Sequence, residues 1–434
     1  MHDDVWSLSP KAHECAACFE VLPAGSETSL KKLPAIKQIS TVDSLQKAWK
    51  SMSRKNKHSY GADRVTLKAF ASDLGANLIE ISKSLSKGTY QFQQLRPAVV
   101  KKAGTNKFRP IQIPAIRDRV VMKALARHIQ PSFAKFDLPC SFAFIKGRDR
   151  GVKAAIAEIQ KLNDAGYIYY FEADIINFFG SVDRKKLWKM FSARIREKSL
   201  LPMLEKCFNL ELDDLQSYQV EHQEIFLGAT EGIPQGGVLS PLLANFYLHQ
   251  FDKRVTSKGF QLVRYADDFV VMCKTAEEAR AAHIFCRNEL KKLGLSIHDI
   301  ELPASKTRLG NFRKDGLAFL GVRFEGKNVY PDTKVVKRFK EKVSASLHSS
   351  QEKTLPRIFQ GLSNLIVGWG RGYQEMKVTE LYRDLDAYIK VEVIRYLNTS
   401  GIQLRGRNIR KQLKFLGIPS LSAMVVHGDG NHSA

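Results

Sequence analysis

Three aspartates, remote from one another in the chain, have the residue type and positions for metal chemistry. Asp174 ends a β-rich run over 167–173, and Asp267 and Asp268 form a turn between two β-rich runs within 260–274. Carboxylates at strand ends reach solvent but are held on a rigid sheet. Mg²⁺ prefers a few carboxylate oxygens plus substrate phosphates, and two such ions can support an in-line displacement at phosphorus. Aspartates chosen only for turn formation are the alternative.

Hydrophobic periodicity predicts the elements that position these aspartates. It indicates a helix over 66–88 capped by Thr66 and ended by Gly88, a basic hairpin with strands at 95–101 and 109–113 around a turn at 103–106, and helices over 119–129 and after Asp183. Residues 332–425 are predicted to be wholly helical, with apolar faces formed by Val336, Phe339, Val343 and Leu347, by Ile358, Phe359, Leu362, Leu365, Ile366 and Trp369, and by Leu381, Leu385 and Tyr388. The sequence therefore predicts an α+β body with a helical appendage.

The charge of the chain points to a polyanionic partner. The 434 residues carry 68 Lys and Arg against 44 Asp and Glu, a net charge of +24. Much of the excess lies in 41–160, some lies in 331–434, and the middle of the chain is near neutral. This distribution would be explained if the basic flanks bind phosphates and the near-neutral middle binds cations. The alternative is that the excess lysines and arginines lie on solvated helix faces.

The sequence predicts a cytoplasmic protein without a membrane partner. No apolar run approaches the roughly 20 residues of a membrane span, and the N-terminus has no basic, then apolar, leader. The six cysteines are scattered, as expected of reduced thiols. Cys15 and Cys18 form a CxxC near His13, but no second ligand pair follows at zinc-finger spacing.

Several short motifs occur in a specific order. Residues 232–245 read GIPQGGVLSPLLAN, residues 265–268 read YADD, and Gly294-Leu295, Ser305-Lys306-Thr307 and Phe319-Leu320-Gly321 follow. With these motifs in this order, the chain from about Ser44 to Leu416 resembles a reverse transcriptase of the bacterial group II intron lineage.

The resemblance implies a right-hand polymerase within the α+β class. It implies an N-terminal arm at 1–40, basic fingers at 41–165, a palm at 166–330 with a helical insertion at 185–225 that returns to the fingers, a helical thumb and maturase-like RNA-binding region at 331–425, and a flexible tail at 426–434.

The same resemblance implies a metal site and nucleotide contacts. Asp174, Asp267 and Asp268, with the backbone carbonyl of Ile175, would hold two Mg²⁺ ions, for which Mn²⁺ can substitute. The predicted nucleotide contacts are Lys107 and Arg109 at the triphosphate, Phe179 against the sugar, Gln235 beneath the nucleotide, and Lys306 as an acid for pyrophosphate. The alternatives are exposed strand-edge charges for Lys107 and Arg109, core packing for one of Phe178 and Phe179, and a surface lysine at 306.

Nucleic-acid contacts are implied for a larger set. Its members are Arg117, Arg119, Gly236, Gly237, Tyr265, Leu320, Gly321, Arg405, Arg407, Arg410 and Lys411. The 319–321 turn would press on the primer strand, and an ordinary tight hairpin is the alternative. Ala143, Ile145 and Lys146 stand where the family has glycine, arginine and proline, which weakens the case for fingers contacts with the template.

The implied function is copying of an RNA, either an intron RNA or a cognate noncoding RNA, from a DNA or RNA primer with deoxynucleotides. No paired-cysteine endonuclease region follows the thumb. Two alternatives remain open: an intron maturase or RNA chaperone, and protein-primed or template-independent synthesis by a free-standing, defence-associated relative.

Overall fold

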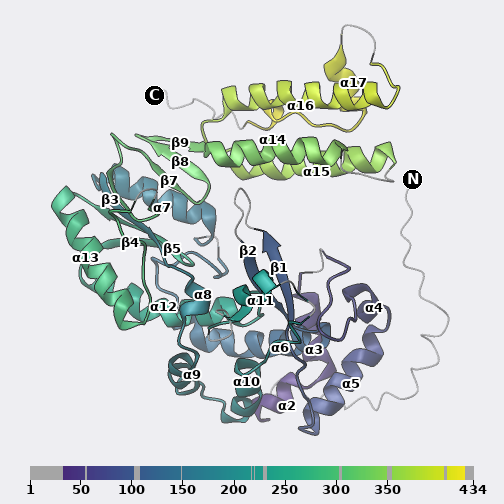
Figure 1. Cartoon of the computed structure of the whole chain (residues 1–434), viewed down its shortest axis with the longest axis vertical. Helices are drawn as coiled ribbons and strands as arrows, with labels where there is room; N and C mark the ends of the chain where they lie inside the picture. The colour runs from purple at the N-terminus through teal and green to yellow at the C-terminus, as the bar shows by residue number, and fades with distance from the viewer. Residues whose placement is uncertain are drawn as a thin grey trace, which may run out of the picture. The chain divides into compact units, whose positions relative to one another are not determined.

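The computed structural model describes residues 33–53, 56–101, 108–147, 149–216, 218, 220–227, 232–302, 305–348, 354–404 and 408–425. The chain forms two compact units, Met1–Asp137 with Asn177–His249 and Leu138–Ile176 with Gln250–Ala434, called here unit 1 and unit 2. Figure 1 labels their elements. The predicted arm at 1–40, except its last residues, the CxxC and the tail lie outside the described residues, and the predicted domain boundaries remain predictions.

Unit 1 is mainly helical. Its elements are α2 (Ala35–Ile39), α3 (Val42–Lys50), α4 (Leu67–Ser72), α5 (Leu74–Ser86), β1 (Arg96–Lys101), β2 (Phe108–Ile113), α6 (Ile116–Phe133), η3 (Ala134–Phe136), α8 (Phe178–Ser181), α9 (Arg184–Ser192), η4 (Lys198–Leu200), α10 (Leu201–Phe208) and α11 (Val220–Leu227). Side-chain oxygens of Thr41, Thr66 and Asp183 cap the N-termini of α3, α4 and α9. α12 (Ser240–Ser257) carries the chain from unit 1 into unit 2.

The single helix predicted over 66–88 is wrong in one respect, because it breaks at Asp73. This residue has φ −124° and ψ 36°, and it ends α4 and precedes α5. The side-chain amide of Asn77 donates to the carbonyl of Phe70 at 3.0 Å, which satisfies an acceptor that the ended helix leaves open. The predicted end is confirmed, since Gly88 has φ +71° just after α5.

The predicted basic hairpin is confirmed. β1 and β2 pair antiparallel, from Arg96 opposite Ile113 to Lys101 opposite Phe108. The hydroxyl of Tyr218 donates to the carbonyl of Pro97 at 2.6 Å, and α11 packs on β2. The turn at the tip, with Lys107, lies outside the described residues.

Unit 2 is built on an antiparallel sheet of order β4-β5-β3-β6. Its strands are β3 (Tyr169–Asp174), β4 (Gln261–Tyr265), β5 (Asp268–Cys273) and β6 (Arg308–Asn311). Side chains alternate between the faces, so Tyr170 and Met272 meet α7 (Val152–Asp164) on one face and Phe171 meets α13 (Ala276–Lys292) on the other. A second sheet contains β7 (Leu317–Phe319), β8 (Val322–Glu325) and β9 (Asn328–Pro331).

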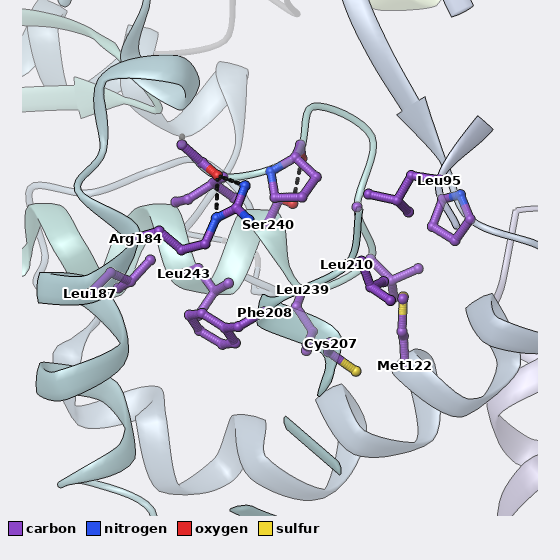
Figure 2. A pocket seen from close by; sticks show the side chains of 16 residues that line it. Leu95, Met122, Arg184, Leu187, Cys207, Phe208, Leu210, Leu239, Ser240 and Leu243 are labelled. Atoms are coloured by element: carbon purple, nitrogen blue, oxygen red, sulfur yellow. Dashed lines mark hydrogen bonds between the residues drawn. The ribbon is translucent and has the colours of Figure 1, made fainter. Parts of the chain in front are cut away.

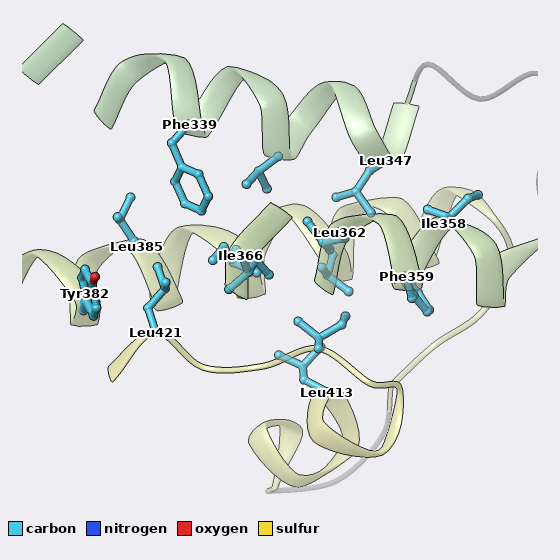
Figure 3. Close-up of a cluster of buried hydrophobic side chains, with 14 of the residues drawn as sticks. Phe339, Leu347, Ile358, Phe359, Leu362, Ile366, Tyr382, Leu385, Leu413 and Leu421 are labelled. Carbon is cyan, nitrogen blue, oxygen red and sulfur yellow. The ribbon is translucent and has the colours of Figure 1, made fainter. Parts of the chain in front are cut away.

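Four helices complete unit 2 and confirm the predicted helical appendage. They are α14 (Thr333–His348), α15 (Leu355–Tyr373), α16 (Thr379–Thr399) and α17 (Ile409–Phe415), followed by the short turn η5 (Ser422–Met424). Their predicted apolar faces pack on one another, and Figure 3 shows side chains such as Phe339, Leu362 and Leu385 directed into one core. Each such burial contributes about 1.5–3 kcal/mol, so tertiary packing holds these helices in place. Within the described residues, no helix has the length and apolar character to cross a bilayer.

Candidate active site

Two strands of unit 2 bring the predicted carboxylates together. Asp174 ends β3, Asp268 begins β5, and the two are direct partners across the antiparallel ladder. Opposite residues on one face of such a pair have Cβ atoms about 4.5–5.5 Å apart. The backbone N–H of Ile175 donates to the carbonyl of Asp267 at 3.1 Å. All four predicted metal-site residues therefore gather at one end of this sheet.

The turn that carries Asp267 is held in an unusual backbone conformation. Tyr265 pairs with Asp268, so only Ala266 and Asp267 connect β4 to β5. Ala266 has φ +59°. A positive φ at the first position of a two-residue turn is normally taken by glycine, and the left-handed region costs other residues roughly 1–2 kcal/mol. Surrounding contacts must therefore maintain this turn.

One lysine balances the negative charge of the cluster. Lys306 forms an ion pair with Asp174, which lies 132 positions earlier in the chain. Loss of hydration within the crowded site, followed by the charges of Asp267 and Asp174, raises the pKa of Asp268 to about 7, and Lys306 opposes this rise. Asp268 as a whole residue is still exposed, so its carboxyl remains accessible to a cation.

These residues fit Mg²⁺ by donor type and charge. Hard divalent cations select carboxylate oxygens. Burial, and then repulsion from Asp267 and Asp174, raises the pKa of Asp268, and a bound cation would relieve the repulsion. In the part of the chain that the structure describes, no three His, Cys, Asp or Glu side chains already converge as a metal-ligating group. The carboxylate of Asp174 is engaged by Lys306 instead.

In unit 1, the predicted nucleotide contacts at Arg109 and Gln235 lie on elements that are joined to each other. The side chain of Arg109 is exposed on β2, and the N–H of Gln112 on the same strand donates to the carbonyl of Gln235 at 2.7 Å. Gly236 has φ +103°, and a Cβ there would lie 3.1 Å from Cγ2 of Ile111. Gly236 therefore lies close to β2, and its predicted contact with nucleic acid remains a prediction.

The loop that carries Gln235 is also fixed to the segment that carries Phe179. The N–H of Ile233 donates to the carbonyl of Phe179 at 2.7 Å. A Cβ on Gly232 would lie 1.9 Å from that same carbonyl oxygen, so only glycine fits. Arg184 donates to the carbonyl of Gly232 through Nε at 3.0 Å and Nη2 at 2.8 Å, as Figure 2 shows.

A second bond in Figure 2 closes this loop on itself. The hydroxyl of Ser240 donates to the carbonyl of Pro234 at 2.7 Å. A Cβ on Gly237 would lie 2.5 Å from Oγ of Ser240, so Gly237 serves this internal packing. The loop that supplies Gln235 is therefore held within unit 1 by hydrogen bonds to β2, to the Phe179 segment, to Arg184 and within itself.

The two adjacent phenylalanines have different environments. Phe178 is 2% exposed, whereas Phe179 is half-buried, and their ring centroids lie 5.2 Å apart. Core packing is thus the role of Phe178. Phe179 is partly accessible to solvent, and its predicted contact with the sugar remains a prediction.

Arg117 and Arg119 are committed to protein partners. Arg117 stacks over the ring of Tyr90 at 5.2 Å and pairs with Glu80 at 3.5 Å. Arg119 donates to the carbonyl of Pro114 at 2.8 Å and to the hydroxyl of Ser59 at 3.0 Å. These contacts give both arginines a structural role within unit 1, and their contact with the template remains a prediction.

The remaining predicted residues lie in unit 2 or outside the described residues. Tyr265 ends β4 and packs against the hydrophobic core of unit 2. Leu320 and Gly321 have φ +51° and +81° and form a tight turn between β7 and β8. Arg410 and Lys411 are exposed on α17. Lys107, Arg405 and Arg407 lie outside the described residues. The roles predicted for these residues remain predictions.

Sequence reasoning missed Arg184 and Arg264. Arg264 is 0% exposed within β4, next to buried Leu262 and Val263. An arginine within an apolar strand requires a buried partner, so its position was a usable signal. For Arg184 the sequence offered no comparable signal, because its acceptor is a backbone carbonyl.

The chain is similar to a known protein family and to several known proteins. The model of the family "Reverse transcriptase (RNA-dependent DNA polymerase)" matches residues 100–324. Protein YkfC of Escherichia coli (strain K12) is 27% identical over 342 residues, covering 69% of this chain and 85% of that protein. The group II intron-encoded protein LtrA of Lactococcus lactis is 27% identical over 222 residues, covering 51% of this chain and 34% of that protein.

Solved structures give weaker likenesses. A partial Cas6-RT-Cas1–Cas2 complex is 23% identical with a TM-score of 0.34, covering 60% of this chain and 42% of that one. Apo telomerase from Candida tropicalis is 13% identical with a TM-score of 0.41, covering 84% of this chain and 70% of that one.

The family match extends over more than half of the chain, so the protein belongs to the reverse transcriptase family. The predicted α+β polymerase fold class, the enzyme class and the relationship to group II intron-encoded proteins are confirmed. Divalent metal ions and an RNA template are general to this family.

Proposed function

We propose that the protein copies RNA into DNA, with Asp174, Asp267 and Asp268 holding two Mg²⁺ ions. The observation that carries the proposal is the cross-strand pairing of Asp174 with Asp268 beside the Asp267 turn. Carboxylates placed opposite each other repel, and an inactive scaffold has no reason to gather them beside RNA.

Each predicted site residue then has a role in the reaction. Divalent ions at the three carboxylates would activate the primer 3′ hydroxyl and stabilise the charge that develops on pyrophosphate. Lys306, whose ammonium already contacts Asp174, would donate a proton to the leaving pyrophosphate. Lys107 and Arg109 would neutralise the triphosphate, and Phe179 would exclude a 2′ hydroxyl from the sugar pocket.

The interlocked loops of unit 1 support this assignment. Hydrogen bonds join β2 to the Gln235 loop and that loop to the Phe179 segment. A nucleotide held by all three would meet a preorganised surface, which lowers the entropic cost of reaching the reactive geometry. The sugar and triphosphate contacts would then be set by one rigid body.

The experiment is primer extension by the purified full chain on an RNA template with Mg²⁺ and deoxynucleotides. The expected product is DNA complementary to the template. Failure to extend any primed RNA, with Mg²⁺ or Mn²⁺, would sink the proposal. Sequencing the nucleic acid that the purified protein binds and makes would identify template, primer and product together. Unprimed or untemplated DNA in that product would favour the protein-primed or template-independent alternative.

A second candidate function, RNA binding as an intron maturase or chaperone, is favoured by a groove in the C-terminal helices. The groove measures about 1090 Å³ and is lined by five cations, Arg383, Lys390, Arg410, Lys411 and Lys414. Its one carboxylate, Asp386, accepts from the hydroxyl of Ser420 and from the N–H groups of Leu421 and Ser422. Cations arranged in this way suit a phosphate backbone.

DNA synthesis on an RNA template and RNA binding as a maturase or chaperone can be distinguished by experiment. Replacement of Arg410 and Lys411 by alanine should weaken RNA binding across sequences and reduce its salt dependence. Splicing or RNA folding that depends on these two residues and survives Asp267→Ala would make RNA binding the main role.

A further inference from the structure

Arg264 is the largest fully buried side chain among the described residues. It lies in β4, one residue before the YADD motif, and the strand ladder aligns it with Phe269. Taking a guanidinium out of water is costly unless it is paired and hydrogen-bonded. Its partners must therefore explain why a cation is placed there.

The partner is Asp252 of α12, which is also fully buried. Nε of Arg264 donates to Oδ1 of Asp252 at 2.6 Å, and Nη2 donates to Oδ2 at 2.5 Å. Nη2 also donates to Oγ of Ser141 at 2.8 Å. The backbone around the arginine is fixed as well, since its N–H donates to the carbonyl of Cys140 at 2.8 Å and its carbonyl accepts from Phe142 at 2.9 Å.

The last contact of this network reaches the catalytic turn. Nη1 of Arg264 donates to the carbonyl of Ala266 at 3.0 Å. That carbonyl belongs to the peptide group joining Ala266 to Asp267, and Ala266 is the residue with the strained φ of +59°. On the other side of Asp267, its own carbonyl accepts from the N–H of Ile175 at 3.1 Å. The peptide groups on both sides of Asp267 are thus fixed.

We propose that Arg264, clamped by Asp252, is a positioning residue that sets the orientation of Asp267 for divalent-cation binding. The inference rests on the proposed function, because it assigns Asp267 to the metal site. Stability alone does not require an ion pair here, since a buried ion pair can often be replaced by apolar side chains of similar volume without loss. Apolar replacements would, however, leave the strained turn without its donor.

Arg264→Lys tests the geometry while keeping the charge. One ammonium cannot engage Asp252 in bidentate fashion, Ser141 and the carbonyl of Ala266 together. Residues that orient metal ligands typically change metal affinity or activity about 10–100-fold when replaced. We expect the variant to bind Mn²⁺ about tenfold or more weakly, measured as the loss of the free-ion electron paramagnetic resonance signal on titration of the full chain. The Mg²⁺ concentration for half-maximal extension should rise in parallel, with KM for deoxynucleotide within about twofold of wild type.

A double variant separates positioning from folding. Asp252→Leu with Arg264→Met removes both charges together, so thermal stability should stay near that of wild type. The weakened Mn²⁺ binding should persist, because the turn still lacks its donor. A matched control is Arg254→Met with Glu289→Leu, which removes an ion pair of 2.6 Å between α12 and α13. Its Mn²⁺ affinity should remain within about twofold of wild type.

The outcomes distinguish this inference from the proposed function. Wild-type Mn²⁺ affinity in a folded Arg264→Lys or double variant would overturn the positioning role and leave the polymerase proposal intact. Absence of RNA-templated extension by the wild-type chain would sink the polymerase proposal. The Mn²⁺ titration would still decide whether Arg264 orients Asp267 for cation binding, because it does not depend on polymerase activity.

Discussion

Asp174 and Asp268 face each other directly across the β3–β5 ladder, although 93 intervening residues separate them in the chain. Like charges in such a pair destabilise a sheet by roughly 0.2–1 kcal/mol. The fold therefore maintains a local repulsion at the end of its central strands, and several consequences can be measured.

Asp268→Asn should stabilise the metal-free protein. At pH 8 the change removes one charge of the repelling set, and a gain of roughly 1–4 °C in melting temperature is expected for unit 2. At pH 6 the gain should shrink, because the raised pKa of about 7 leaves Asp268 largely protonated there. Differential scanning calorimetry in chelator measures this, and Mg²⁺ should then raise the melting temperature of wild type more than that of the variant. Equal Mg²⁺ effects on both proteins would argue against a cation at Asp268.

Lys306→Met should separate two roles of the lysine. Loss of the ammonium removes a competitor for Asp174, so the Mg²⁺ concentration for half-maximal activity should fall about two- to tenfold. If Lys306 also protonates pyrophosphate, kcat at saturating Mg²⁺ should fall about 100-fold or more. Steady-state extension over a range of Mg²⁺ concentrations gives both values. Lys306→Arg, which keeps the charge, is the control for the first effect, and an unchanged Mg²⁺ requirement in the methionine variant would contradict it.

Phe179→Val should relax selection of the sugar. The half-buried ring is the accessible member of the phenylalanine pair, and shortening it opens space for a 2′ hydroxyl. The ratio of kcat/KM for ribonucleotide to that for deoxynucleotide should rise about tenfold or more. Phe178→Leu is the matched control, because it alters the buried neighbour and should lower stability without changing this ratio. A wild-type ratio in Phe179→Val would remove this residue from the sugar contact.

Asp118 should make the stability of unit 1 depend on pH. Burial raises the pKa of this residue to about 6, although Tyr90 and Gln93 donate hydrogen bonds to it. A carboxyl that is harder to ionise in the folded state costs stability as pH rises from its unfolded pKa of about 4 to its folded pKa of about 6, at most about 3 kcal/mol. Asp118→Asn should lack that loss. Urea denaturation at pH 4.5 and 7.5 tests this, and parallel losses in both proteins would contradict the assignment.

The sequence predicted the elements around the site well, because their signals are local. Apolar residues at helical spacing identified the C-terminal helices, and the run that ends at Asp174 identified its strand. The break at Asp73 was missed because the buried face of Leu67, Phe70 and Leu78 continues through it. The turn depends on a side-chain bond from Asn77, which apolar periodicity does not reveal.

Contacts between residues far apart in the chain were harder to predict from the sequence. The aspartates could be named from their motifs, but the direct opposition of Asp174 and Asp268 is a property of strand register. The ion pair of Lys306 with Asp174 and the clamp of Asp252 on Arg264 likewise depend on how β6 and α12 pack. The contacts of Arg117 with Glu80 and of Arg119 with the carbonyl of Pro114 were likewise not predictable from sequence, because they depend on how unit 1 packs.

The most direct test of the central claim is primer extension on an RNA template by Asp267→Ala beside wild type. Asp299→Ala, a change of an aspartate outside the paired strands, is the control. The metal-site account predicts that Asp267→Ala loses extension while keeping its fold and its affinity for primed RNA, and that the control keeps wild-type activity. Extension by Asp267→Ala at a rate near that of wild type would contradict the account.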